Sequence, residues 1–122
     1  MHAATFGGNP IASAAGIATL EMIEQENLLE NVSVLAELFA SSFNQLQQQC
    51  QWTREVRVAG MMVGIELEVE GASVVQKCLD RNLLINCTQG NVIRLLPAMN
   101  LTTEQASEGI EILSDVLRNL QA

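Results

Sequence analysis

Aromatic residues and positive charges are both scarce in this sequence. Aromatic residues make up 3% of the 122 positions and Tyr is absent, so we expect a core built from Leu, Ile, Val, Ala and Met. Only six Lys and Arg stand against 14 Asp and Glu, which gives a formal net charge of −8. Nucleic-acid binding needs clustered basic residues that displace phosphate counterions, so this composition excludes a nucleic-acid partner. The negative charge also disfavours contact with an anionic membrane surface.

Cysteine and histidine are equally sparse. The three cysteines Cys50, Cys78 and Cys87 are widely spaced, and His2 is the only histidine. This pattern argues against a bound metal and against a disulfide framework, and it is typical of a protein from the reducing cytoplasm. No basic segment precedes an apolar run near the start, and no apolar run reaches 18 residues. We therefore expect neither a signal peptide nor a membrane-spanning helix.

Hydrophobic periodicity predicts an ordered series of helices and strands. Spacings of three and four predict helices, whereas alternation predicts strands, and a T-x-x-Q capping box at Thr102 marks the start of the last helix. The expected helices span residues 10–24, 28–48, 72–81 and 103 onward, and the expected strands lie within 56–68, 83–86 and 92–95, with a turn at 89–91. Gly60 and Gly64 interrupt the first strand region and indicate a bulge or a close approach. This order predicts an α+β fold, a small and mainly antiparallel sheet covered by helices.

The loop Thr5–Pro10 is a candidate ligand site. Thr5 offers a hydroxyl, two glycines allow a close approach, and Asn9-Pro10 begins a helix, so together they could hold a phosphate or another anion. The alternative is a simple helix entry. The first helix is rich in Ala and contains Gly16, which predicts another backbone packed close to it. Because a domain seldom starts inside a functional site, we expect the chain to be a piece of a larger enzyme.

Two arginines are further candidates. Arg94 lies among aliphatic residues in the strand 92–95, either as a solvated edge residue or aimed at a ligand carboxylate, which its planar fork can bind through both oxygens. Arg57 either belongs to an ordinary glycine-kinked strand or pairs with one of the many carboxylates. Lys77, the only lysine, is expected on a solvated helix face. No complete catalytic set of side chains is present in the sequence.

Three ordered segments, Thr5–Pro10, Arg57–Leu67 and Val92–Pro97, resemble the C-terminal part of class III (subgroup II) pyridoxal-phosphate aminotransferases. The chain departs from that pattern at Ala4, where serine is usual, and at Val58, where a glycine is usual. The resemblance covers nearly the whole chain. It implies a fold-type I enzyme, with residues 1–25 as the end of a large domain and residues 26–122 as a small C-terminal α+β domain.

The resemblance also implies an activity, transamination between N-acetylornithine and 2-oxoglutarate in arginine biosynthesis by a cytoplasmic homodimer. Thr5 would bind the phosphate of pyridoxal 5′-phosphate in the partner subunit, and Arg94 would bind the α-carboxylate of the substrate. The lysine that carries the cofactor would lie upstream, so the chain alone would be inactive. Ornithine, 4-aminobutyrate and succinyldiaminopimelate are alternative donors. A free-standing, non-catalytic binding module is the alternative from another class.

Overall fold

The computed structural model describes residue 5 and residues 7–120. Four helices and four strands make up this part of the chain, in the order α1, α2, β1, β2, α3, β3, β4, α4. Their bounds are α1 (Pro10–Gln25), α2 (Leu28–Gln49), β1 (Thr53–Ala59), β2 (Met62–Leu67), α3 (Ala72–Leu79), β3 (Asn86–Thr88), β4 (Val92–Leu95) and α4 (Thr103–Arg118). No described helix is long and apolar enough to span a membrane.

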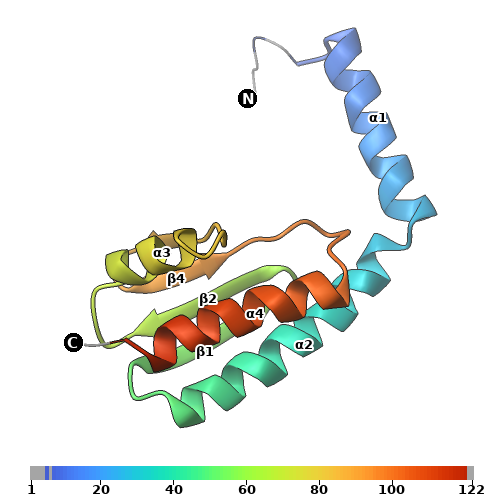
Figure 1. Ribbon diagram of the computed structural model, residues 1–122. Coiled ribbons are helices and arrows are strands. Elements are labelled where there is room, and N and C mark those ends of the chain that lie inside the picture. The colour runs from blue at the N-terminus through green and yellow to red at the C-terminus, as the bar shows by residue number, and fades with distance from the viewer. Residues whose placement is uncertain (1–4, 6, 121–122) are drawn as a thin grey trace.

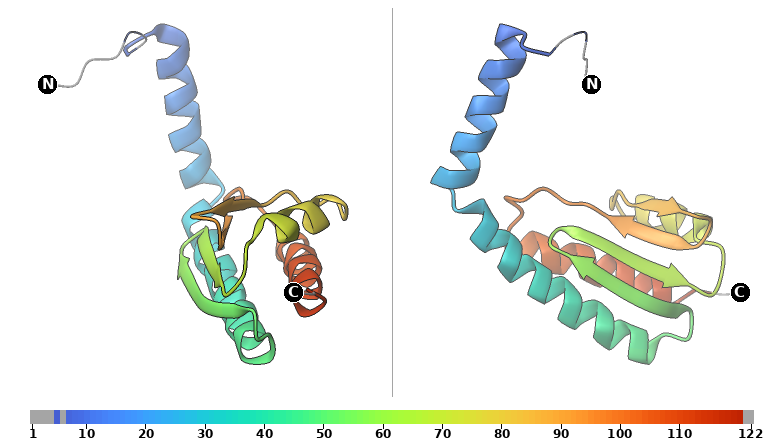
Figure 2. Two further views of the ribbon diagram at one scale, coloured as in Figure 1. Left: turned by 90° about the vertical axis from the view of Figure 1, so that its left-hand side faces the viewer. Right: turned by 180° about the vertical axis from the view of Figure 1, so that it is seen from behind.

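The four strands form one sheet in the order β1-β2-β4-β3, and each neighbouring pair is antiparallel. Helices α2, α3 and α4 cover one face of this sheet, whereas none of the described helices covers the other face (Figures 1 and 2). We call this second side the open face. The fold is therefore α+β with an antiparallel sheet, which confirms the predicted class.

The core lies between the sheet and the covering helices. Val63, Ile65 and Leu67 of β2 are fully buried, whereas the alternating residues of that strand point to the open face. Helix α2 contributes two phenylalanines, Phe39 and Phe43, whose rings stack with centroids 6.1 Å apart. The expectation of an aliphatic core was therefore wrong in one respect. Two aromatic rings lie at its centre, because α2 places Phe39 and Phe43 one turn apart on its inward face.

A tight hairpin joins β1 to β2. Ala59 pairs with Met62, and Gly60, at φ 57°, provides the left-handed backbone that a two-residue turn needs at its first position. Gly60 is thus a turn residue, not a bulge, and the irregularity in the pairing lies between Thr53 and Glu55. Val58 pairs with Val63 inside the ladder, so a side chain at this position is accommodated.

The strand expected at residues 83–86 was misplaced, since β3 begins only at Asn86. The residues just before β3 belong to the turn that ends α3. Asn82 adopts φ 63°, and the Leu83 N–H donates to the Cys78 carbonyl. Leu84, although apolar, is 84% exposed. The apolar run therefore serves as a connection from the helix to the sheet edge, and only its end pairs with β4.

Helices α4 and α1 differ sharply in their environment. Thr102 and Gln105 form both hydrogen bonds of the predicted capping box, and α4 buries residues such as Leu113 and Leu117. Helix α1 extends away from the sheet and contains no buried residue (Figure 1). Gly16 has no atom within 4 Å of the position its Cβ would take, so the backbone expected against this helix is not among the described residues.

Candidate functional site

The open face of the sheet gathers the charged side chains of three strands. Arg57 on β1 and Arg94 on β4 both lie directly opposite Gly64 on β2, so the three residues form a row across the sheet. Two residues further along β2, Glu66 points to the same side. The alternation of β2 delivers its apolar residues to the core and leaves these polar positions facing outward.

Arg94 is exposed although its strand lies in the interior of the sheet, between β2 and β3. It is therefore not an edge residue, which corrects one of the two interpretations of its position. No hydrogen bond or ion pair joins its guanidinium to any residue that the structure describes. Because it is solvated, the charge carries no burial penalty, and its five N–H donors stay available to a ligand.

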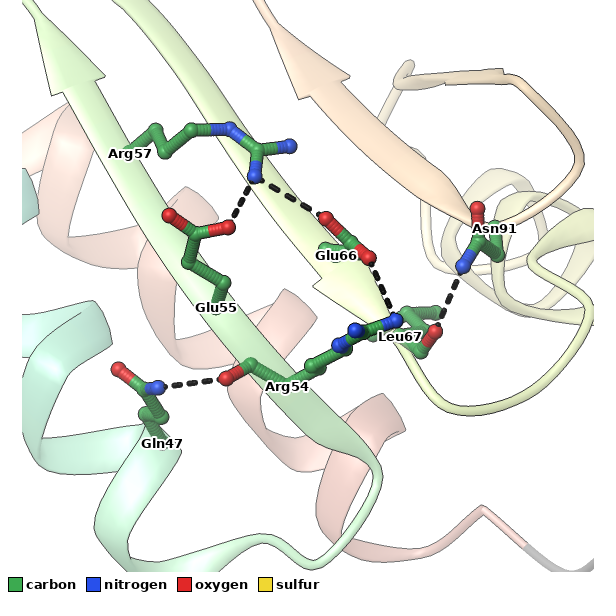
Figure 3. A network of polar contacts seen from close by, with 7 residues as sticks. All are labelled: Gln47, Arg54, Glu55, Arg57, Glu66, Leu67 and Asn91. Carbon is green, nitrogen blue, oxygen red and sulfur yellow. Dashed lines mark hydrogen bonds and ion pairs between the residues drawn. The ribbon is translucent and has the colours of Figure 1, made fainter.

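Arg57, by contrast, is bound by two carboxylates through one of its nitrogens (Figure 3). Its Nη1 donates to Glu55 Oε2 and to Glu66 Oε2, the latter at 3.0 Å. Glu66 also accepts from Arg54 Nη1 at 3.1 Å through its other oxygen. The hydrogen bond to Glu66, followed by the charge of Glu55, raises the pKa of Arg57. The expectation that Arg57 pairs with a carboxylate is confirmed.

A hollow of about 310 Å³ lies over Gly64, and both Arg57 and Arg94 line it. A Cβ at Gly64 would stand 3.9 Å from Arg57 Nε and 3.8 Å from Val92 Cγ1. The Arg57 side chain therefore lies over β2 at Gly64, at ordinary contact distance from the position of that Cβ. Its guanidinium binds Glu66 on the same strand.

Arg94 also borders a second hollow, of about 380 Å³, between the end of β4 and α4. Most of its lining is aliphatic, from residues such as Leu83, Ile85 and Ile110. Asn31 of α2 fixes the chain that leaves β4 along this hollow, since its Nδ2 donates to the Met99 carbonyl at 2.7 Å and to the Leu101 carbonyl at 3.0 Å. These hydrogen bonds hold the segment that follows β4, the strand that carries Arg94.

The N-terminal loop lies at the end of α1 that is remote from the sheet (Figure 2). Thr5 is exposed, and Gly8 has φ 77°. Asn9 Oδ1 accepts from the N–H groups of Ile11 at 2.9 Å and Ala12 at 3.4 Å, so the first donors of the helix are already bonded. Phosphate binding at this loop would therefore depend on the Thr5 hydroxyl and on loop N–H groups. Phe6 and His2 lie outside the described residues.

The structure does not bring the two sequence-predicted site residues together. Thr5 precedes α1, whereas Arg94 lies on the sheet, with the length of that helix between them (Figure 1). Lys77 is exposed on α3, which covers the face opposite Arg94. The described residues thus place a carboxylate-binding group and a hydroxyl-bearing loop on separate surfaces, with no lysine beside Arg94.

Alternation along the strand that contains residues 63–69 predicted Gly64 and Glu66 on its polar face, which β2 confirms. Sequence reasoning missed the residues opposite them, because these depend on strand register, and it missed Asn31. Asn31 gave no signal, because its acceptors lie 68 and 70 residues away along the chain. The three cysteines are free thiols and do not enter the site.

Comparison with known proteins places these features in a family context. The family model described as Aminotransferase class-III matches residues 1–117. The acetylornithine aminotransferase of Caldanaerobacter subterraneus subsp. tengcongensis is 41% identical over 121 residues, covering 98% of this chain and 31% of the relative. That of Nitrosomonas europaea is 39% identical, covering 95% of this chain and 30% of the relative.

Solved structures give the same picture. The acetylornithine aminotransferase of Elizabethkingia anophelis superposes with a TM-score of 0.90 at 29% identity, covering 98% of this chain and 31% of that protein. The ornithine delta-aminotransferase of Plasmodium falciparum superposes with a TM-score of 0.89 at 28% identity, covering 96% and 31%. The chain thus spans about 30% of the length of the curated relatives that it matches.

Proposed function

The chain belongs to the class III aminotransferases, and from this membership we propose that it forms the C-terminal part of a pyridoxal-phosphate-dependent enzyme. The reaction that we assign to the whole enzyme transfers an amino group from N-acetylornithine to 2-oxoglutarate. The names of the relatives favour this donor over ornithine, 4-aminobutyrate and succinyldiaminopimelate. They also favour an enzyme over a non-catalytic binding module. Arginine biosynthesis is the corresponding pathway.

The unpaired guanidinium of Arg94 is the observation that carries this proposal. Carboxylates bind Arg57 and Arg54 on β1, whereas none of the described carboxylates binds Arg94, two strands away on β4. The negative charge of a substrate α-carboxylate would neutralise Arg94, and the planar fork of arginine can bind both carboxylate oxygens. Such a two-point contact would fix the rotation of the substrate about its carboxylate and so orient the α-carbon.

The proposed roles of Thr5 and Arg94 are compatible with pyridoxal phosphate as the cofactor. Pyridoxal phosphate, when bound, acts as an electron sink for the substrate α-carbon. Thr5 would donate its hydroxyl to the cofactor phosphate of the partner subunit, since this loop lies far from the sheet of its own chain (Figure 1). This role requires a homodimer. The lysine that holds the cofactor would come from the remainder of the enzyme, because Lys77 lies on α3, away from the open face.

We further propose that residues 1–25 belong to the large domain of the enzyme and residues 26–122 to its small domain. Helix α1 contributes no buried residue, whereas α2 and the elements after it share one core. The free thiols Cys50, Cys78 and Cys87 are consistent with a cytoplasmic location.

The test is a kinetic comparison in the full-length enzyme that carries this chain. Loss of charge-assisted hydrogen bonds in Arg94→Gln should raise KM for the amino donor by roughly 10- to 100-fold. Arg118→Gln is the matched control, because this exposed arginine lies at the end of α4 on the covered side of the sheet. KM in the control should stay unchanged. An unchanged KM in Arg94→Gln would remove Arg94 from the substrate site.

A donor panel tests the substrate. N-acetylornithine should give the highest kcat/KM with 2-oxoglutarate as acceptor, above ornithine, 4-aminobutyrate and succinyldiaminopimelate. A higher value for another of these donors would reassign the enzyme within its family and leave the role of Arg94 intact.

A further inference from the structure

Arg57 and Arg94 border one hollow on the open face, and the described carboxylates neutralise only Arg57. Arg57 and Arg94 are both opposite Gly64, so their Cα atoms are separated by two strand spacings, about 10 Å. Arginine side chains are long enough to close much of this gap. The Arg57 side chain already lies over Gly64, with its Nε 3.9 Å from the position of the missing Cβ.

The carboxylates that engage Arg57 come from both sides. Glu55 is the second residue before it on β1, and Glu66 is two residues beyond Gly64 on β2. Glu66 is further held by Arg54 at 3.1 Å (Figure 3). The group of four charges is therefore neutral and shares its hydrogen bonds internally. No equivalent carboxylate reaches Arg94 among the described residues.

The fold itself does not need this network. The side chains of Arg57 and Glu55 are 48% and 55% exposed, and ion pairs at such positions contribute little to stability. The two carboxylates matter more for the charge of the open face, because they neutralise Arg57. Without them, a second unpaired guanidinium would border the same hollow as Arg94.

We propose that Glu55 and Glu66 determine specificity by masking Arg57, so that the open face binds one carboxylate group through Arg94 and does not bridge a dicarboxylate. This inference rests on the proposed role of Arg94 and adds a specificity rule to it. A ligand with two carboxylates, such as a 2-oxo diacid, would be held at one end only. Its other end would stay free for groups outside this face.

The experiment compares acetate with glutarate on the full 122-residue chain at constant ionic strength, reading the Nε–Hε resonances of Arg57 and Arg94 by ¹⁵N NMR. In the wild type, both anions should shift the Arg94 resonance and leave that of Arg57 in place. Glutarate should bind no more than about twofold better than acetate, because its second carboxylate gains no simultaneous partner.

In Glu55→Gln/Glu66→Gln, Arg57 is unmasked. Glutarate should then shift both arginine resonances, and its preference over acetate should rise to about tenfold or more. Glu68→Gln/Glu70→Gln is the control, since it removes the same two charges from exposed positions that contact no arginine. It should keep the wild-type ratio. Adding Arg57→Gln to the unmasked variant should also restore that ratio.

Three outcomes would overturn the inference. One is a tenfold glutarate preference in the wild type, and another is the same ratio in the unmasked variant as in the control. The third is a raised ratio that persists after Arg57→Gln. These results leave the proposed function standing whenever acetate shifts the Arg94 resonance. If acetate never shifts it, the carboxylate-binding role of Arg94 fails, and the specificity rule fails with it.

Discussion

Gly64 lies directly opposite Arg94 in the pairing of β2 with β4, so no side chain stands beside the guanidinium on that strand. The backbone does not require glycine there, because Gly64 is not among the residues with positive φ. Glycine inside a strand weakens it, since the unfolded chain gains freedom and no side chain packs. Neither the backbone conformation nor the strand therefore calls for glycine at position 64.

Gly64→Ala should consequently stabilise the chain, by about 0.5 kcal/mol in the free energy of unfolding. The new methyl group would meet its neighbours at 3.8 and 3.9 Å, which are ordinary contacts. Urea unfolding gives the measurement. Gly60→Ala is the control and should destabilise by about 1 kcal/mol, because its φ of 57° is unfavourable for alanine. Destabilisation by Gly64→Ala would show that the strand needs this glycine.

The stacked phenylalanines should dominate the core. Phe43 is fully buried, so Phe43→Ala should remove about 3–5 kcal/mol of unfolding free energy through lost transfer energy and a new cavity. Leu29→Ala, at a residue of the same helix that is 66% exposed, should change it by less than about 0.5 kcal/mol. The two variants need only one denaturant titration each. A small effect at Phe43 would mean that the core packs differently around α2.

The capping box of α4 gives a local prediction. Thr102→Ala removes the acceptor for the Gln105 N–H, which stands 3.2 Å away, and should cost about 1 kcal/mol. Ser107→Ala is the comparison within the same helix, since this exposed hydroxyl bonds only to the carbonyl of Thr103. Its effect on the thermal midpoint should be clearly smaller. Equal midpoints for the two variants would count against the cap.

These cases show which parts of the structure are readable from sequence. The helices α1, α2 and α3 and the capping box were predicted, because apolar spacing and caps depend on residues a few positions apart. The strand expected at residues 83–86 failed, since the end of α3 competes for those residues through the bond from Leu83 to Cys78. Whether these residues end the helix or pair in the sheet depends on tertiary packing, which leaves no pattern in the local sequence.

The site follows the same division. Motif order identified the family, and strand alternation separated the core face of β2 from its polar face. The masking of Arg57 by Glu66 depends on register, which is set by the turn at Gly60. The contact between α2 and the chain beyond β4 joins residues about 70 positions apart, so no local signal reports it. The roles of Thr5 and Arg94 stay predictions.

Cys78 should make stability sensitive to alkaline pH. Burial raises the pKa of its thiol from 9.0 to about 11, although the charge of Arg81 acts in the opposite direction. The folded state thus favours the neutral thiol. The contribution of this thiol to the stability of the fold is complete below pH 9, where it is protonated in the folded and the unfolded state. That contribution is lost as pH rises from 9 to 11.

Urea midpoints measured between pH 7 and 11 test this. Cys78→Ala should lower stability at neutral pH, because it leaves a cavity, yet show a shallower decline above pH 9. Parallel declines in the wild type and the variant would assign the alkaline limb to other groups.

Helix α1 should exchange its amide hydrogens far faster than α2. Its 16 residues bury no side chain, and isolated helices of this length are marginal in water. Hydrogen-exchange mass spectrometry should show early labelling of peptides from α1 and late labelling of those from α2. Protection of α1 that grows with protein concentration would indicate that a second molecule covers it.

Strand β1 ends the sheet order, so one side of its backbone has no ladder partner in the described sheet. Such a side is a template for further strands, and proteins often guard it with charge. Here Arg54, Glu55 and Arg57 lie along this border, with charges of both signs that a uniform apolar strand could not match. Glu55 and Arg57, which take part in the proposed masking, therefore also discourage growth of the sheet from chain to chain. Their replacement should be judged by solubility as well as by binding.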